Sequence, residues 1–361
     1  MVQKIHPKLK TLFVTYGGSH YKLFNILNNN FNNTSLMDKR FEQDFKKHFN
    51  YVKNSNLIFS KTKFDLFLKI RKIIKNKDLI ISNCPISGAL VYFATLFKRK
   101  KKVFLMCQDF YEYFEISEKK LIRKWLYGSL LKFFIRLSCR HALTIVLSNY
   151  IKKKAIGYGS KNIKIIPIYG IDMTIFKPKE TNIKFDSTKK IILTTARFSP
   201  EKGLIYILKA ISELENVLLV MVGPGKNKEL KEVIDKLRIN DKVKIIGEVD
   251  PIKIADYYNS CDIFVLPSLR EGLGFSSGES MACKKPVIAS NTGGIPDIVI
   301  KNQTGILIES GNIKQLKEAI LKLINSKQFS KKLIENGFKH IKDNYQEQEL
   351  TKKFVETLEK F

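Results

Sequence analysis

The sequence of 361 residues has few cysteines, and their spacing matches neither a metal site nor a set of disulfide partners. The five cysteines include no CxxC pair and form an odd number; they are Cys84, Cys107, Cys139, Cys261 and Cys283. This pattern excludes a disulfide-rich secreted scaffold and a zinc-ribbon site, and it fits a reduced cytoplasm. We therefore expect a cytoplasmic protein.

Long hydrophobic runs are also missing from the sequence. The longest apolar stretch, GALVYFATLF, is too short to cross a bilayer, and the N-terminal residues hold too short an apolar run for a signal peptide. The sequence thus predicts neither a transmembrane nor a secreted protein. A chain of this length is too long for one ordinary core and indicates two domains.

Acidic residues are scarce in the first half of the chain. Residues 1–180 hold 35 lysines and arginines against 11 acidic residues, a net charge of +24, whereas residues 181–361 carry only +6. A compositional bias of the source organism would raise both halves alike. The asymmetry therefore indicates an anionic partner for the first half.

Apolar runs of strand length alternate with segments of helical length along the whole chain. Continuous Val, Ile and Leu runs separated by helices are typical of parallel strands buried on both faces. The runs expected to form strands are TLFVTY, DLIISN, KVFLMC, ALTIVLS, IKIIPI, IILTTAR, VLLVMVG, KVKIIGE, DIFVLPS, PVIAS and GILIE. We predict two doubly wound α/β domains, residues 1–178 and 179–346, because a polar stretch at residues 176–190 interrupts the alternation.

Four loops of the second half follow a predicted strand: TARFSPEKG, MVGPGKN, REGLGFSSGESM and ASNTGGIPDIV. Ligands of open α/β sheets bind at the carboxyl ends of the strands, so these loops are expected to share one site. Arg197 and Lys202 stand at a helix start, where they oppose the helix dipole unless an anion is bound. The two cations indicate a diphosphate ligand.

These loops, together with IIGEV and TGILI, resemble in order and content the donor domain of retaining glycosyltransferases of family 4, over about residues 190–330. The resemblance implies the GT-B fold, in which two Rossmann-like parallel-sheet domains face each other across a cleft. It implies a hexosyltransferase-type enzyme that retains anomeric configuration and takes a UDP- or GDP-sugar. The implied acceptor is a glycan or a lipid-linked molecule in the synthesis of cell-surface polysaccharide or glycoconjugate.

The resemblance also assigns roles to single residues. Arg197 and Lys202 match the diphosphate-binding pair, Glu279 matches the residue that binds the ribose hydroxyls, and Glu271 matches the residue that faces the donor sugar. Backbone contacts to the donor are expected in the glycine loops, at Gly17, Gly18, Gly223, Gly272, Leu273 and Gly274. The chain contains no D-x-D pair, so we expect no metal ion and no cofactor, with the nucleotide sugar as a substrate.

The N-terminal half resembles the family more loosely. Gln108 and Asp109 stand where many members have His-Asp, so we predict Asp109 at the catalytic centre, with Gln108 and His20 on the acceptor side. For His20, a surface or helix-capping role is an equal alternative. An amphipathic helix at residues 347–361 is expected to join the first domain, as the last helix of the family does.

A helix is predicted at residues 121–140, LIRKWLYGSLLKFFIRLSCR. Leu126, Leu130, Phe133 and Leu137 form one stripe, with Trp125, Lys132, Arg136 and Arg140 roughly opposite. One interpretation is a core helix with a basic outer face. The other is peripheral attachment to an anionic membrane, on the inner face of the plasma membrane.

Other classes of function are less consistent with the sequence. Paired glutamates also occur in glycosidases, but hydrolysis of a neutral sugar has no use for the cations. Nucleic-acid binding would suit the charge of the first half, yet no helix-turn-helix, zinc or RRM signature is present. A transferase that glycosylates DNA and a catalytically silent partner that binds sugar nucleotides remain alternatives.

Overall fold

The computed structural model describes four ranges of the chain, residues 9–15, 21–42, 56–117 and 121–361. The chain divides into two compact units. The first comprises Met1–Tyr169 and Leu350–Phe361, and the second comprises Gly170–Glu349. The division precedes the predicted boundary after residue 178, because Ile171 bridges to Gln346 within the second unit.

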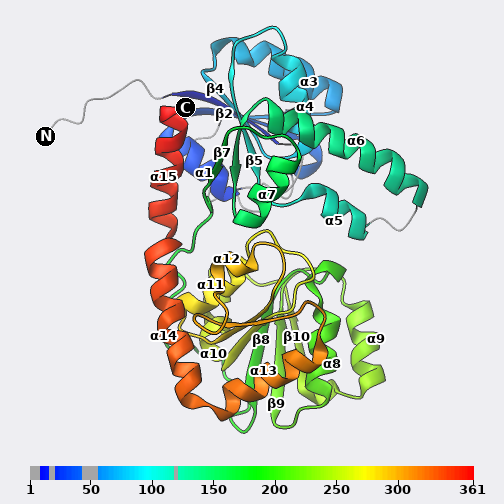
Figure 1. Cartoon of the computed structure of the whole chain (residues 1–361), viewed down its shortest axis with the longest axis vertical. Helices are drawn as coiled ribbons and strands as arrows, with labels where there is room; N and C mark the ends of the chain where they lie inside the picture. The colour runs from blue at the N-terminus through cyan, green and yellow to red at the C-terminus, as the bar shows by residue number, and fades with distance from the viewer. Residues whose placement is uncertain (1–8, 16–20, 43–55, 118–120) are drawn as a thin grey trace, which may run out of the picture. The chain divides into compact units, whose positions relative to one another are not determined.

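The first unit contains a parallel sheet of seven strands, in the order β3-β2-β1-β4-β5-β6-β7. Its strands are β1 (Lys10–Thr15), β2 (Asn32–Asp38), β3 (Asn56–Ser60), β4 (Leu79–Ser82), β5 (Lys101–Met106), β6 (Leu143–Val146) and β7 (Ile163–Ile165). Its helices are α1 (Tyr21–Asn30), α3 (Lys63–Ile73), α4 (Pro85–Ala94), α5 (Phe110–Ser117), α6 (Leu121–Arg140), α7 (Asn149–Gly157) and α15 (Glu347–Lys360), with short 3₁₀ turns η1 (Lys39–Phe41) and η3 (Ile74–Asn76). Helices flank the sheet, as a doubly wound fold requires (Figure 1).

Strands β2 and β3 were missed by the sequence prediction. β2 reads NNTSLMD, which is mostly polar, yet six of its seven residues are buried. Side-chain hydrogen bonds make this burial possible: Thr11 Oγ1 donates to Asn33 Oδ1 at 2.9 Å, and Lys77 Nζ donates to Thr34 Oγ1 at 2.7 Å. Polar residues that satisfy one another across strands leave no hydrophobic pattern to detect.

The long helix predicted at residues 121–140 forms α6, but the prediction of its core stripe is wrong. Leu126, Leu130 and Phe133 are exposed, and Leu137 is only half-buried. The buried side of α6 instead consists of Gly128, Ile135, Ser138 and Cys139. Both sides of the helix are apolar, so its periodicity could not tell the core side from the outer side.

The second unit contains a parallel sheet of six strands, in the order β10-β9-β8-β11-β12-β13. Its strands are β8 (Lys190–Thr195), β9 (Val217–Val222), β10 (Val243–Gly247), β11 (Ile263–Leu266), β12 (Val287–Ser290) and β13 (Ile306–Ile308). Its helices are α8 (Leu204–Ser212), α9 (Lys228–Leu237), α10 (Ile254–Ser260), α11 (Phe275–Ala282), α12 (Ile295–Ile298), α13 (Ile313–Asn325) and α14 (Lys327–Asn344), with 3₁₀ turns η4 (Pro200–Lys202) and η5 (Asn240–Lys242).

The two sheets share one strand order. Counted from the first strand of each unit, both run 3-2-1-4-5-6, and the first unit adds a seventh strand at its edge. This is the order of the Rossmann fold, whose ligands bind where the order reverses, between the first and fourth strands. The predicted pair of doubly wound domains is confirmed, and in the second unit the reversal lies between β8 and β11.

Candidate functional site

The four loops singled out in the second half lie at one edge of the second sheet. They follow β8, β9, β11 and β12, and these strands all run parallel, so their carboxyl ends meet at the same edge. The loops after β8 and β11 flank the reversal point itself. The sequence therefore places its cations and glutamates where a Rossmann-like sheet binds a ligand.

Glycines let these loops pack backbone against backbone. Gly203 has φ of 63°, and a Cβ at this position would lie 2.1 Å from the carbonyl oxygen of Pro267 in the loop after β11. Gly293 has φ of 56°, and a Cβ there would lie 1.9 Å from the carbonyl oxygen of Glu271. Only glycine combines this conformation with such a close approach, so both positions fix the loop that bears Glu271.

Lys202 and Glu271 form an ion pair across the reversal point. Lys202 Nζ lies 2.6 Å from Glu271 Oε2, and both side chains are mostly buried. Ser268 Oγ donates a second, longer hydrogen bond of 3.3 Å to the same oxygen. Residues 69 positions apart in the sequence therefore neutralise each other at the site.

Arg197 lies at the exposed side of the site. Its side chain is 58% exposed, and Nη2 stands 3.7 Å from the nearly buried carboxylate of Glu201. Glu201 accepts a hydrogen bond of 2.5 Å from Ser199 Oγ, and its carbonyl oxygen accepts one of 2.8 Å from the Leu269 amide. Glu201 thus ties the loop after β8 to the loop after β11, and the Arg197 side chain lies mostly in solvent beside it.

The carboxylate of Glu279 is hydrogen-bonded to a buried tyrosine. Tyr258 Oη lies 2.7 Å from Glu279 Oε2 and 2.6 Å from Thr195 Oγ1. Burial raises the pKa of Tyr258 well above its ordinary value, and the Glu279 carboxylate raises it further. A neutral phenol has one proton, which must go to the carboxylate, so Thr195 donates to Tyr258 and Tyr258 donates to Glu279.

Helix α11 begins between the two glutamates of the motif. Gly274, with φ of 87°, is its N-cap, and Glu279 lies on the helix itself. The side chain of Leu273 is 1% exposed, so only its backbone could reach a ligand. The site therefore combines two cations, two carboxylates and a helix N-terminus, and a helix N-terminus attracts anions. The predicted donor contacts of Gly223, Gly272, Leu273 and Gly274 stay predictions.

Asp109 belongs to the first unit, where it follows β5 and has structural partners. It is 6% exposed and caps α5 by accepting from the Tyr111 amide at 3.0 Å, while Tyr158 Oη donates to it at 3.0 Å. Lys154 Nζ is 3.8 Å away. These contacts give Asp109 a role in holding α5 to α7, and its predicted role in catalysis remains a prediction.

For the other site residues predicted in the first unit, the structure gives little or no information on contacts. Gln108 is half-buried beside Asp109. Gly17, Gly18 and His20 lie outside the described residues, so the structure does not test their predicted roles. The second unit, by contrast, places Arg197, Lys202, Glu271 and Glu279 in or directly after the loops at one sheet edge, and Lys202 and Glu271 are in contact.

Three polar residues at or near the reversal points of the two sheets were not singled out from the sequence. Tyr258 and Thr195 position Glu279, and no sequence signal links them because they lie on α10 and β8. Asn83 directly follows β4 at the reversal point of the first sheet; it is 3% exposed, yet neither polar atom of its amide has a partner among the described residues. A polar residue directly after a buried strand was the signal that could have found it.

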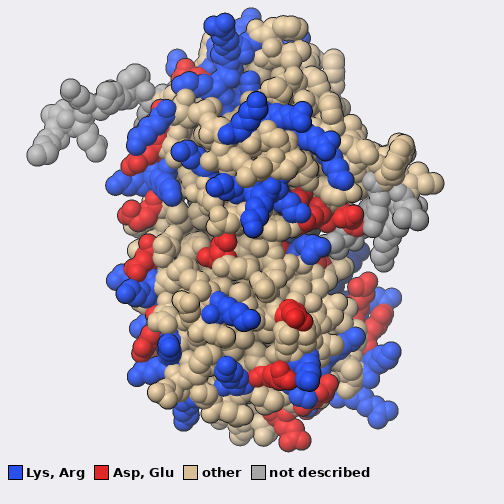
Figure 2. All heavy atoms as spheres, viewed as in Figure 1, with Lys and Arg blue, Asp and Glu red and all other residues tan. Residues whose placement is uncertain are grey.

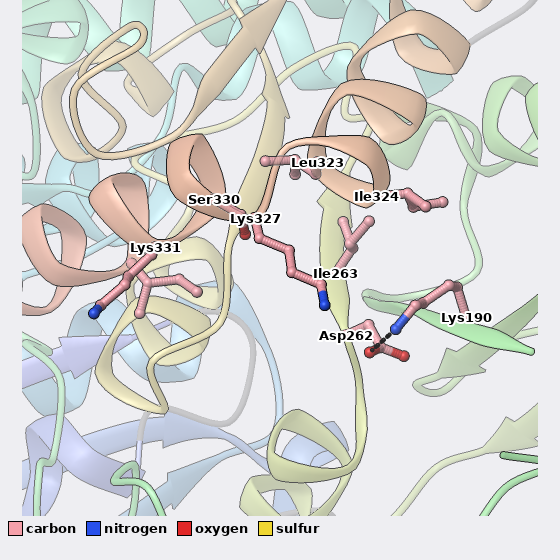
Figure 3. A pocket seen from close by; sticks show the side chains of 9 residues that line it. Lys190, Asp262, Ile263, Leu323, Ile324, Lys327, Ser330 and Lys331 are labelled. Carbon is pink, nitrogen blue, oxygen red and sulfur yellow. Dashed lines mark hydrogen bonds and ion pairs between the residues drawn. The ribbon is translucent and has the colours of Figure 1, made fainter.

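Two cavities of the second unit do not include the four charged residues. One, of about 280 Å³, is lined by Phe198, Pro200, Tyr206 and Leu269 beside the loop after β8. The other, of about 270 Å³, contains the ion pair of Lys190 and Asp262, 3.1 Å apart, with Lys327 pointing toward it (Figure 3). Lys190 begins β8, so this second cavity lies at the amino edge of the sheet, away from the candidate site.

Within the described ranges, no three His, Cys, Asp or Glu side chains gather in a way that could hold a metal ion. Among the helices of the same ranges, none combines the length and the hydrophobicity that a membrane crossing requires.

The family model described as "Glycosyl transferases group 1" matches residues 176–340. One curated relative is the capsular polysaccharide biosynthesis glycosyltransferase CapM of Staphylococcus aureus, 30% identical over 214 residues, which are 56% of this chain and 55% of the relative. The chain spans about half the length of the curated relatives it matches. The residues that the family model matches all lie within the second unit.

Solved structures match over nearly the whole chain. Sucrose-phosphate synthase from Thermosynechococcus elongatus gives a TM-score of 0.83 at 18% identity and covers 98% of this chain and 99% of that chain. HepE of Anabaena in complex with UDP-glucose gives a TM-score of 0.79 at 20% identity and covers 98% of this chain and 100% of that chain. At these identities the likeness shows the fold, and family 4 stays the prediction from the motifs. The chain has the GT-B fold, and its residues 176–340 match the glycosyl transferases group 1 family.

Proposed function

We propose that the chain is a glycosyltransferase that moves a sugar from a nucleotide-sugar donor to a glycan or lipid-linked acceptor. The observation that carries the proposal is the set of Arg197, Lys202, Glu271 and Glu279 at the reversal point of the second sheet. The cations there can bind the charged diphosphate of such a donor, and the carboxylates can bind its neutral hydroxyl groups. The GT-B fold and the group 1 domain support the same activity.

The ion pair suggests how the donor diphosphate would bind. Lys202 Nζ holds the Glu271 carboxylate at 2.6 Å, so an incoming diphosphate would take the place of this carboxylate on the ammonium group. Arg197 would add a bidentate contact from the exposed side, and the N-terminus of α11 would face the same charge. These groups would stabilise the negative charge that grows on the diphosphate as the sugar leaves.

The two glutamates would then bind opposite ends of the donor. Glu271, displaced from Lys202, would face the positive charge that develops on the sugar. Glu279 has its carboxylate fixed by Tyr258 and would accept hydrogen bonds from the ribose hydroxyls. Retention of the anomeric configuration and independence of metal ions complete the proposal.

The comparisons suggest candidates for donor and product. HepE is solved with UDP-glucose, so a UDP-sugar is the first donor to test, and a GDP-sugar is the second. CapM is a capsular polysaccharide biosynthesis glycosyltransferase, so we propose a cell-surface glycan or glycoconjugate as the product. Synthesis in the cytoplasm, at the inner face of the membrane, is part of the same proposal.

A donor panel tests this function. The purified chain is mixed with UDP-, GDP- and ADP-sugars, with and without EDTA, and thermal shift and donor consumption are measured. We expect one donor to stabilise the wild type in the presence of EDTA, and Arg197→Ala and Glu279→Ala to lose this response. Lys228→Ala is the control, because that lysine is 88% exposed on α9 and should leave the response unchanged.

Three outcomes would contradict parts of the proposal. If no nucleotide sugar stabilises the chain, the transferase function is wrong. A chain that binds the donor but neither transfers nor hydrolyses it would be a silent sugar-nucleotide-binding partner. Where a product forms, NMR of its anomeric proton shows whether the configuration is retained, and an inverted product would overturn the proposed mechanism.

A further inference from the structure

Helix α6 of the first unit is apolar on two opposite sides. One side is buried: Ile135 and Cys139 are fully enclosed, and Gly128 packs against the rings of Tyr111 and Phe114 on α5. Further along, Ser138 packs against Gly88 of α4 so closely that a Cβ at Gly88 would lie 2.1 Å from Ser138 Oγ. This side of α6 is the one that holds the helix to the unit.

The other side of α6 presents large apolar side chains to solvent. Ile122 is 76% exposed, Trp125 73% and Leu126 54%, and Tyr127, Leu130 and Phe133 are about half exposed or more. Ile122, Leu126, Leu130 and Phe133 recur at the spacing of one helix face, and Trp125 borders it. A helix with apolar residues all round normally has both sides covered. An exposed apolar face of this length indicates a binding surface.

Exposed apolar residues also occur at the end of α4, near the C-terminal end of α6. The ring of Tyr92 on α4 lies 4.6 Å from the ring of His141, which directly follows α6, so the two helix ends are neighbours. Beyond Tyr92 the chain exposes Phe93, Leu96 and Phe97, the last at 95%, and then runs into Lys98–Arg99–Lys100. Exposed apolar and basic residues thus occur together at both helices.

The charged residues of helix α6 all have one sign. Helix α6 contains five lysines and arginines and no acidic residue: Arg123, Lys124, Lys132, Arg136 and Arg140. Arg136 is exposed on the same side as Phe133, and Lys132 extends over the ring of Tyr111 at 3.8 Å. Figure 2 also shows lysine and arginine side chains at many places on the first unit, with fewer acidic side chains among them.

We propose that the outer face of α6, together with the end of α4, binds the surface of an anionic lipid bilayer. The apolar side chains would enter the region between headgroups and acyl chains, and the arginines and lysines would reach the lipid phosphates. Trp125 and Tyr127 suit this position, because their rings combine an apolar body with a polar atom. The surface deepens the proposed function and rests on its placement of the synthesis at a membrane, but it can be tested separately because binding to lipid needs neither donor nor transfer.

A second copy of the chain is the less favourable occupant. Two copies related by a twofold axis would place α6 against α6, and both helices would bring basic and no acidic residues to the contact. Like charges without acidic partners oppose such a contact. An anionic membrane supplies the opposite charge and covers the apolar side chains at once.

Trp125 is the only tryptophan of the chain, so its fluorescence reports on this surface directly. The full chain, without donor, is titrated with phosphatidylcholine vesicles and with vesicles that contain about one third phosphatidylglycerol. We expect Trp125 emission to shift to shorter wavelength, and the protein to sediment, with the anionic vesicles only. Added salt should weaken this binding without removing it once the apolar residues are inserted.

Two variants separate the apolar part from the charged part, and both keep Trp125 as the reporter. Leu126→Ser with Phe133→Ser should lower vesicle binding about tenfold or more, because two exposed apolar side chains no longer enter the lipid. Arg136→Glu should lower it by a similar factor at low salt only. The matched control is Phe64→Ser on α3, 70% exposed, which should bind as the wild type does.

The proposal is overturned if the wild type does not bind anionic vesicles. It is equally overturned if the double variant, Leu126→Ser with Phe133→Ser, binds them as tightly as the wild type. It is also overturned if sedimentation velocity shows a wild-type dimer that the double variant loses, without any emission shift on vesicles. Equal melting temperatures of the variants confirm that they fold. Vesicle binding by a chain that fails the donor panel would uphold this surface and reject only the transferase function.

Discussion

Tyr258 donates a hydrogen bond to Glu279 from inside the core of the second unit. Its Oη lies 2.7 Å from Glu279 Oε2, and its ring is fully buried between Phe176 and Phe264. A buried donor has no other conformation available, so it restricts the carboxylate to one orientation. Tyr258 is therefore a positioning residue for the proposed ribose contact.

We predict that Tyr258→Phe raises the donor KM about tenfold and changes kcat little. A hydrogen bond to a charged group contributes about 1.5–3 kcal/mol, and here it orients a binding group that does not take part in bond breaking. Steady-state kinetics with the donor identified by the panel measures both constants. Tyr345→Phe is the control, because its hydroxyl donates to the Asp297 carbonyl in the same unit. A lower kcat with an unchanged KM would contradict the assignment.

The Lys202–Glu271 ion pair predicts opposite effects of its two single variants on nucleotide binding. Glu271→Gln removes the carboxylate that competes for Lys202, so the nucleoside diphosphate product should bind several-fold more tightly although transfer is lost. Lys202→Met should bind the same nucleotide at least about tenfold more weakly. Isothermal titration calorimetry measures both. Weaker nucleotide binding by Glu271→Gln would show that this carboxylate does not compete for the cation.

Gly293→Ala should be strongly destabilising. The new Cβ would lie 1.9 Å from the carbonyl oxygen of Glu271, at a φ of 56° that alanine rarely adopts. We expect a loss of about 2 kcal/mol or more in the free energy of unfolding, together with loss of donor binding. Gly157→Ala on α7 has nothing within 4 Å of its Cβ and should be neutral or slightly stabilising in the same urea titration. Equal effects of the two variants would argue against the backbone contact.

Asp109 predicts a pH dependence of stability with a defined sign. Burial raises the pKa of Asp109 in the folded state, and the nearby Glu112 raises it further. The unfolded chain ionises near pH 4, so the contribution of Asp109 to folding is lost as the pH rises from there through the raised value. The free energy of unfolding of the wild type should therefore fall relative to that of Asp109→Asn over this window.

Urea unfolding at successive pH values tests this sign. Asp65→Asn provides the comparison, because a hydrogen bond from Lys69 lowers the pKa of Asp65 and its contribution should be lost as the pH falls. If the free energies of unfolding of the wild type and Asp109→Asn changed with pH in parallel, burial would not perturb the pKa of this carboxyl. Retained transferase activity in Asp109→Asn would assign the residue to structure, through its contacts with α5 and Tyr158.

We predict that replacing Asn83 affects stability and activity in different directions. Its amide is buried without a partner in the described part of the chain, so Asn83→Leu removes an unsatisfied group of similar size. We expect unchanged or higher stability, since an unpaired buried amide is unfavourable. If the amide of Asn83 binds a substrate, the kcat/KM of the same variant should be lower by about tenfold or more. Unchanged kinetics would remove Asn83 from the site.

The site of the second unit could be predicted because its chemistry lies in contiguous loops. Strand, glycine, cation and helix follow one another in the sequence around Lys202 and Glu279, and parallel strands then bring the loops together. Tyr258 could not be predicted, since its link to Glu279 depends on how α10 packs beneath the sheet edge. One of the two interpretations of α6 placed its outer face in the core, because both faces of that helix are apolar, and only packing against α4 and α5 distinguishes them.

Strand β2 has a consequence for how the first sheet avoids mispairing. Thr11 faces Asn33 in the paired register and donates to it, Asn33 in turn donates to Ser35, and Thr34 accepts from Lys77 on the other face. Shifting the strand along its neighbour would separate these partners and leave several buried polar groups unsatisfied, at about 1–3 kcal/mol each. A hydrophobic strand would tolerate a shift by two residues, because another apolar side chain would fill each space. β2 therefore has one correct alignment, and misaligned forms of the sheet are excluded by their energy.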